Sequence, residues 1–170
     1  MPMSEYVRSL RERVGTMQLE MPTASVIVFD DARRILLVRH IEGNEWTTPG
    51  GLIEPEETPA DAAVREAWEE TGLAVELVRI VGVFGGKPCT STYSNGDRVA
   101  WVSTVFEAKV VGGEPRHDGE ETLEVRFVHA DELRKLPRKS HVDMFVDAAL
   151  ARSESAVFQP ACWRPPNTRG

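Results

Sequence analysis

Residues 51–73 read GLIEPEETPADAAVREAWEETGL, and the second half of this stretch carries the clearest secondary-structure signals in the chain. Thr58 is a good N-cap residue, Pro59 suits the first position of a helix, and Asp61 follows Thr58 at the spacing of a capping box. Gly72 stands where a left-handed residue commonly ends a helix. The pattern predicts a helix between these residues.

Three glutamates lie on one face of this predicted helix. Glu69 and Glu70 follow Glu66 by three and four residues, the spacing at which helical side chains are neighbours. Like charges at this spacing destabilise an isolated helix by about 0.2–0.5 kcal/mol per pair. Two interpretations account for the glutamates: a solvated acidic face, or carboxylates that share a hard divalent cation.

The residues around the three glutamates favour the second interpretation, a shared divalent cation. The spacing of residues 51–73 resembles the Nudix box. In that pattern a glycine is followed after five residues by a glutamate, and after seven more by Arg-Glu. Glu-Glu follows after two residues, and a glycine with an aliphatic residue after one. Its specified positions are all filled, by Gly51, Glu57, Arg65, Glu66, Glu69, Glu70, Gly72 and Leu73. The resemblance implies an α/β fold, the Nudix-type α/β/α sandwich with a mixed β-sheet between helices. It also implies a hydrolase that cleaves the pyrophosphate linkage of a nucleoside diphosphate attached to another moiety.

Magnesium supplies what the implied reaction needs. Hydrolysis of a phosphoric anhydride requires neutralised phosphate oxygens and a water in line with the bond that breaks. A divalent cation held by carboxylates neutralises that charge and lowers the pKa of a bound water. By their positions in the box, the expected metal ligands are Glu66, Glu69 and Glu70. The carbonyl of Gly50 is an additional candidate ligand, and Mn²⁺ is the alternative metal.

The resemblance also implies supporting and catalytic roles. Glu57 and Arg65 are expected to support the ligands, because a guanidinium orients carboxylates through paired hydrogen bonds. The general base in this family is either the box position that matches Glu66 or a later glutamate in a loop. Glu120 and Glu121 both fit the later position, and the sequence does not choose between them.

Substrate contacts are expected beside the box and in the loops of residues 41–48 and 85–96. Trp46 and Gly51 flank the start of the box, and Tyr93 offers an aromatic ring that can stack on a nucleobase. ADP-ribose, a nucleotide sugar, a dinucleoside polyphosphate and a (d)NTP all remain candidate substrates. The alternative function is a Nudix-fold regulatory module that binds a nucleotide without cleaving it, although such a module does not need the complete carboxylate set.

The overall composition narrows the class of protein. The chain has 170 residues and a formal net charge of −7, from 20 basic and 27 acidic side chains. Without a basic stripe, a nucleic acid polymer is not an expected partner. The apolar runs are too short to cross a bilayer, and the first twenty residues are too charged for a signal peptide. Cys89 and Cys162 fit reduced thiols, so a cytoplasmic location is expected.

The pattern along the chain predicts one catalytic domain with two extensions. Residues 1–20 form an N-terminal helical extension, residues 21–152 the hydrolase domain, and residues 153–170 a proline-rich tail that is extended or partly disordered. The N-terminal helix is predicted over residues 4–15, where it packs on its own domain or joins two copies in a homodimer. The remaining predicted elements are strands at 23–30, 34–40, 74–84, 97–111 and 123–128 and a helix at 140–152, with the first two strands paired antiparallel.

Three residues near the predicted site need a comment. Glu56 occupies a turn position where many members of the family carry glycine, and Thr48 replaces a common apolar residue before the proline at position 49. Neither change removes an expected ligand. His141 stands near the start of the last predicted helix, where a surface or capping role is expected.

Overall fold

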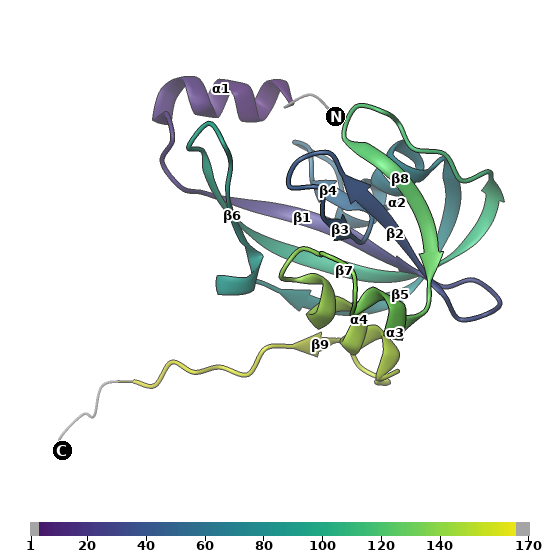
Figure 1. The fold of residues 1–170 in the computed structure, drawn as a ribbon. Coiled ribbons are helices and arrows are strands. Elements are labelled where there is room, and N and C mark those ends of the chain that lie inside the picture. The colour runs from purple at the N-terminus through teal and green to yellow at the C-terminus, as the bar shows by residue number, and fades with distance from the viewer. Residues whose placement is uncertain (1–3, 166–170) are drawn as a thin grey trace, which may run out of the picture.

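Two β-sheets form the centre of the computed structural model, which describes residues 4–165 (Figure 1). The larger sheet has the order β4 (Gly50–Leu52), β1 (Leu19–Val28), β7 (Arg98–Gly113), β5 (Leu73–Phe84) and β9 (Val157–Phe158), and β6 (Thr90–Thr92) pairs with β7. The smaller sheet has the order β3 (Trp46–Thr47), β2 (Ile35–His40) and β8 (Thr122–Val128). Because β1 and β7 are parallel while β5 and β7 are antiparallel, the larger sheet is mixed, as predicted.

Helices α2 (Pro59–Thr71) and α4 (Val142–Leu150) pack against opposite faces of strand β1. Successive side chains of a strand point to opposite faces. Val26 and Val28 belong to the core cluster that contains the alanines of α2, whereas Ile27 belongs to the cluster that contains Phe145 of α4. These layers confirm the predicted α/β/α sandwich. The other helices of residues 4–165 are α1 (Glu5–Val14), α3 (Ala130–Leu133) and the 3-10 helix η1 (Lys87–Cys89).

Helix α2 begins and ends where the sequence predicts. Thr58 Oγ1 accepts a hydrogen bond from the N–H of Asp61 at 3.1 Å. Gly72, with φ of 69°, ends the helix and donates its N–H to the carbonyl of Trp68 at 2.8 Å. Three small, fully buried residues on the side of α2 that faces the sheet allow the helix to lie close to β1 and β4: Ala62, Ala63 and Ala67.

The predicted antiparallel pairing of the first two strands is wrong. Strand β1 pairs with β4 and β7, and β2 pairs with β3 and β8, so they belong to different sheets. A single bridge between Phe29 and Ile35 is their only strand pairing among residues 4–165. The turn between them is held by Asp30, whose carboxylate accepts hydrogen bonds from the backbone N–H and the Nε of Arg34 at 2.8 and 2.7 Å. Both strands are buried on two faces, so their apolar pattern does not specify a partner.

Helix α1 packs on its own domain, beside the tip of the β6–β7 hairpin (Figure 1). Ser4 caps it, because its Oγ accepts a hydrogen bond from the N–H of Val7 at 3.2 Å. Val7 is 8% exposed without any second copy of the chain. The homodimer through this helix stays a prediction.

The C-terminal segment adds one short strand to the sheet. Strand β9 pairs parallel with β5 at Gly82 and Val83. Residues 159–165 form neither helix nor strand, in keeping with their prolines, and Phe158 and Trp163 are 77% and 73% exposed. Pro166, part of the predicted tail, lies outside the described residues. Both cysteines are free. Within residues 4–165, the helices are too short or too polar to span a membrane.

Candidate active site

The carboxylates of α2 differ in their exposure to solvent. Glu66 and Glu70 are buried, at 6% and 3% exposed, whereas the side chain of Glu69 is 37% exposed. Both buried carboxylates belong to the side of the helix that faces strand β4. Two buried acidic groups on adjacent turns repel each other strongly unless positive charge or hydrogen-bond donors surround them.

Arg65 provides one source of positive charge. Its Nε and Nη2 donate to the two oxygens of Glu57 at 2.8 and 2.9 Å. Its Nη1 donates to Glu66 Oε1 at 2.8 Å and to Glu69 Oε2 at 2.9 Å. Nη2 also donates to the carbonyl of Leu52 at 3.0 Å. These bonds raise the pKa of the guanidinium and hold the loop before α2 against the helix.

The glycines before the box allow the backbone to approach the carboxylates closely. The N–H of Gly50 donates to Glu70 Oε2 at 3.0 Å. Gly50 has φ of 153°, and a Cβ there would overlap the carbonyl of Ala24. A Cβ on Gly51 would overlap the carboxylate of Glu66. Gly51 therefore leaves space for a buried carboxylate and Gly50 holds one in place.

Burial controls the protonation of the inner carboxylates. It raises the pKa of Glu70 well above its usual value, and the charge of Glu66 raises the pKa further, while the hydrogen bond from Gly50 opposes both effects. Burial also raises the pKa of Glu66, although Arg65 opposes that shift. The pair is therefore short of positive charge, which a bound cation would supply.

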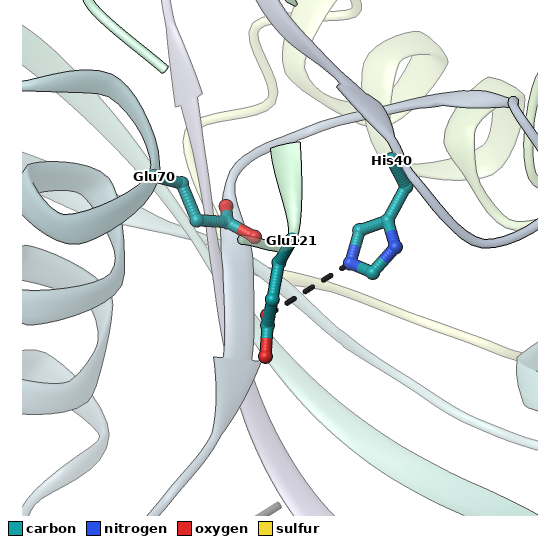
Figure 2. Close-up of side chains that lie close together, drawn as sticks. All are labelled: His40, Glu70 and Glu121. Carbon is teal, nitrogen blue, oxygen red and sulfur yellow. Dashed lines mark ion pairs between the residues drawn. The ribbon is translucent and has the colours of Figure 1, made fainter. Parts of the chain in front are cut away.

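A third acidic group joins the pair from another sheet. Glu121, immediately before β8, and His40, at the end of β2, lie near Glu70, and one ligand atom from each lies within 4.8 Å of the others. Figure 2 shows the three side chains converging, with His40 Nε2 4.0 Å from Glu121 Oε2. Glu120 is exposed. The structure thus separates the two loop glutamates: Glu121 reaches the carboxylates, and Glu120 does not.

Asp118 fixes this arrangement of the loop. Its Oδ1 accepts hydrogen bonds from the N–H groups of Glu120, Glu121 and Thr122 at 3.0, 3.1 and 2.9 Å. Thr122 Oγ1 in turn donates to the backbone carbonyl of Glu70 at 3.3 Å. Sequence reasoning missed His40 and Asp118. Neither belongs to the box: the pairing of β2 with β8 brings His40 to the site, and the loop before β8 brings Asp118 there.

A cavity of about 510 Å³ lies beside Glu66 and Glu121. Its lining includes Glu66, Gly50 and Gly51 at one side and Tyr93, which is 39% exposed, at another. Of the predicted substrate contacts, Gly51 and Tyr93 therefore line the cavity. Trp46 does not. It is 4% exposed and packs in the core, with the Arg126 guanidinium 4.8 Å from its ring centroid.

His141 is the N-cap residue of α4, as expected, but its side chain makes no capping hydrogen bond and lines the cavity instead. Its ring lies edge-on to Trp101, with centroids 5.6 Å apart, and 4.9 Å from the ring of Phe145. Its Nε2 lies 3.2 Å from Thr47 Oγ1. Burial, with a smaller contribution from the charge of Lys139, lowers the pKa of the imidazole to about 4. The ring is therefore a neutral, packed part of the cavity wall at neutral pH.

The sequence model of the NUDIX domain family matches residues 19–147. The chain belongs to this family. Its box comprises strand β4, helix α2 and the loop between them, which are the elements that bring together Arg65, Glu66 and Glu70. The matched residues include both sheets except strand β9 and end within α4, while α1 lies outside them.

Several known proteins resemble this Nudix chain. A MutT-like protein of Streptomyces ambofaciens is 32% identical over 143 residues, which cover 84% of this chain and 85% of that protein. An RNA pyrophosphohydrolase of Pseudomonas fluorescens is 42% identical over 65 residues, or 38% of this chain and 41% of that protein. A human relative is named diphosphoinositol polyphosphate phosphohydrolase 3-alpha. The family and its named members identify the protein as an enzyme of the Nudix pyrophosphohydrolase type, which acts on phosphoric anhydrides.

Solved structures share the fold. A Nudix hydrolase from Nitrosomonas europaea matches with a TM-score of 0.66 at 24% identity, covering 78% of this chain and 90% of that one. An ADP-ribose pyrophosphatase from Streptococcus suis matches with a TM-score of 0.59 at 25% identity, covering 81% and 96%. Both likenesses agree with the mixed sheet between helices described above.

The donors at the centre of the site fit a divalent cation. Glu66 and Glu70 are buried acidic groups whose charges a cation would balance, and Glu121 adds a third carboxylate. Such oxygen-rich sets suit Mg²⁺ and Mn²⁺, and the imidazole of His40 is a ligand that Mn²⁺ tolerates better than Mg²⁺ does. The residues that could hold a metal are therefore Glu66, Glu69, Glu70 and Glu121, with His40 beside them.

Proposed function

We propose that this enzyme is a Mg²⁺-dependent hydrolase that cleaves the pyrophosphate linkage of a nucleoside diphosphate attached to another moiety. The observation that carries the proposal is a cavity whose lining joins the carboxylates of Glu66 and Glu121 to apolar and aromatic side chains. Its volume of about 510 Å³ is that of a site for a small-molecule ligand. Phosphates of the substrate would lie at the carboxylates, and the rest of the substrate along the wall.

The proposed metal ligands are Glu66, Glu69 and Glu70, with Mn²⁺ as the alternative metal. When bound, the cation neutralises charge on the phosphate oxygens and makes a bound water easier to deprotonate. Arg65 orients Glu66 and Glu69 through its hydrogen bonds from Nη1. The Gly50 N–H does the same for Glu70. A carbonyl ligand from Gly50 stays a prediction.

Glu121 is the proposed general base. Glu121 lies in a loop whose backbone N–H groups are hydrogen-bonded to Asp118. These bonds hold Glu121 near Glu70 before substrate binds. His40 lies 4.0 Å from Glu121, and burial lowers the pKa of its imidazole, so a neutral ring is present near the base. Glu66 is less suited, because Arg65 already occupies its Oε1.

The substrate class is supported by the charge of the protein and by its relatives. The net charge of −7 does not favour a nucleic acid polymer. The Streptococcus suis structure is of an ADP-ribose pyrophosphatase, and another neighbour, the Nudix domain of Shewanella oneidensis NrtR, was solved with ADP-ribose. We propose ADP-ribose, nucleotide sugars, dinucleoside polyphosphates and (d)NTPs as the range to test. A cytoplasmic location is also proposed, on the basis of two free cysteines.

Two variants test the proposed chemistry. The wild-type protein is incubated with that panel, with and without Mg²⁺, and the products are separated by chromatography. We expect Mg²⁺-dependent release of a nucleoside monophosphate, and loss of at least about 100-fold in kcat in Glu66→Gln and in Glu70→Gln. Titration calorimetry of Mg²⁺ binding should show weaker binding in both variants. Near-normal turnover in both would overturn the assignment of the site, and nucleotide binding without any product would overturn the hydrolase.

A further inference from the structure

Helix α1 lies outside the residues that match the family model, yet buried contacts fix it to the Nudix domain. Arg11 Nη1 donates to the carbonyls of Gly15 and Met17 at 3.1 and 2.6 Å, and its Nη2 donates to the carbonyl of Arg98 at 2.8 Å. Its Nε lies 3.5 Å from Asp97 Oδ2, and the two side chains are only 9% and 13% exposed. Because Arg98 is the first residue of β7, these contacts attach α1 to the larger sheet.

Helix α1 also closes one end of the cavity that contains the carboxylates. Ser4, Val7 and Arg11 line the same cavity as Glu66 and Gly51. The sequence predicts that this helix packs on its own domain or on a second copy, and it predicts no contact to substrate. The structure instead makes it a wall of the proposed substrate site.

Strand β1 shows how the cavity changes in character along its length. Its alternate residues, Leu19, Met21, Thr23 and Ser25, all line the cavity. Ser25 pairs with Gly50 beside the carboxylates, whereas Leu19 pairs with Val99 beside α1. Six residues of strand span about 20 Å, which accommodates a diphosphate and an attached nucleoside. The floor is therefore polar near the carboxylates and apolar near α1.

The end of the cavity near α1 is suited to an uncharged, flat group. Apolar and aromatic side chains form it: Val7, Leu19, Met21, Val99 and Trp101. Arg11 and Asp97 at this end form an ion pair with each other, and the side chains of Glu42 and Glu54 also line the cavity. Aromatic and aliphatic surfaces favour planar rings, and paired charges offer nothing to a second polyanion.

The geometry points to α1 as a specificity-determining wall, in which Val7 contacts the uncharged nucleobase of the substrate while the α2 carboxylates act on its phosphates. This inference rests on the proposed function, since it places the phosphates at α2. It assigns Arg11 a positioning role, because its hydrogen bonds hold the wall in place without reaching the reacting atoms.

Measurements of ligand binding, rather than of turnover, test the proposed contact between α1 and the nucleobase. Titration calorimetry in the presence of Mg²⁺ compares AMP, GMP, CMP and UMP with ribose 5-phosphate, which has the phosphate and no base. In the wild type, at least one nucleotide should bind about tenfold or more tightly than ribose 5-phosphate. Val7→Trp fills the base site and should remove that difference, while ribose 5-phosphate binds as before. The matched control Glu12→Trp places the same side chain on the exposed side of α1 and should bind as the wild type does.

Arg11→Met gives a second, independent variant. It removes the hydrogen bonds to β7 and should weaken binding of the preferred nucleotide about tenfold, again without changing ribose 5-phosphate. The wall is refuted if no nucleotide binds more tightly than ribose 5-phosphate in the wild type, or if both variants keep the wild-type preference. Because monophosphates are not cleaved, these results are separate from the hydrolase assay: a protein that prefers nucleotides but hydrolyses none would overturn only the proposed function.

Discussion

Arg65 holds Glu57 with two parallel hydrogen bonds, from Nε to Oε1 at 2.8 Å and from Nη2 to Oε2 at 2.9 Å. This pair joins the loop before α2 to the helix, and it lowers the pKa of Glu57 through the hydrogen bonds and the charge of the guanidinium. Glu57 therefore fixes the plane of the guanidinium, and the guanidinium then fixes Glu66. The arrangement of the carboxylates on α2 therefore depends on a residue outside the helix.

Arg65→Lys should separate charge from geometry. An ammonium keeps the positive charge but cannot donate to Glu57 in parallel and reach Glu66 at the same time. We expect kcat to fall about 10- to 100-fold, as for other residues that orient metal ligands. The free energy of unfolding should fall by about 1–3 kcal/mol. Initial rates and urea unfolding measure the two effects.

Arg134→Lys is the matched control for this change. Arg134 forms an ion pair with Asp147 at 2.6 Å, and both side chains are about half exposed. An exposed pair of this kind contributes at most about 1 kcal/mol. The control should therefore keep wild-type turnover. Equal losses of activity in the two variants would contradict the positioning role of Arg65.

Alanine at the two glycines should have different consequences. In Gly51→Ala the new methyl group meets the movable carboxylate of Glu66, so we expect a strong loss of turnover with a modest loss of stability. In Gly50→Ala it meets the backbone carbonyl of Ala24, and φ of 153° is unfavourable for alanine, so stability should fall by about 1–3 kcal/mol or more. Thermal unfolding and initial rates distinguish the two outcomes.

Gly112→Ala controls for the loss of a glycine in a strand. A Cβ at Gly112 would meet only Ala74 Cβ, at 3.9 Å, which is an ordinary contact. We expect wild-type turnover and a change in stability below about 1 kcal/mol. If Gly51→Ala resembles this control, Glu66 does not need the space that Gly51 leaves.

Glu121→Gln and Glu120→Gln test the assignment of the base. The substitution removes one negative charge from each of two adjacent residues, of which only Glu121 reaches Glu70. Loss of a general base lowers turnover by about 10²- to 10⁴-fold. We expect that loss in Glu121→Gln and close to wild-type rates in Glu120→Gln. A larger effect in Glu120→Gln would mean that the loop moves when substrate binds.

The local signals in the sequence predicted α2 and both of its ends well. Thr58, Pro59 and Gly72 act within a few residues of themselves, so their effect on the helix does not depend on the rest of the fold. Glu56 illustrates the limit of such reasoning. It adopts φ of 69°, the conformation that favours glycine, so the chain tolerates a strained residue in this turn.

Strand pairing, and contacts between residues far apart in the sequence, could not be predicted from local patterns. Strands β1 and β2 are both apolar on two faces, so nothing in either distinguishes a hairpin from membership of two sheets. His40 and Glu121 meet only because β2 pairs with β8. The position of Trp46 was misleading for a similar reason: an aromatic residue beside the box is equally suited to the core, where the structure places it.

His141 should make the stability of the protein depend on pH in a mildly acidic range. Its pKa is lowered from 6.5 to about 4 in the folded state, so between these values the unfolded chain binds a proton that the folded chain does not. The contribution of His141 to the free energy of unfolding is therefore fully present above pH 6.5 and is lost as the pH falls toward 4. The slope is at most about 1.4 kcal/mol per pH unit.

Urea unfolding of the wild type and of His141→Gln across this pH range measures the effect. Glutamine keeps a polar group near Thr47 but does not titrate, so the variant should lose less stability on acidification than the wild type does. Other titrating groups, among them His40 and the carboxylates, are present in both proteins and cancel in the difference. His117→Gln, in an exposed loop, controls for the loss of a histidine and should keep the wild-type slope. Identical slopes in the wild type and His141→Gln would show that the imidazole is not held neutral within the cavity wall.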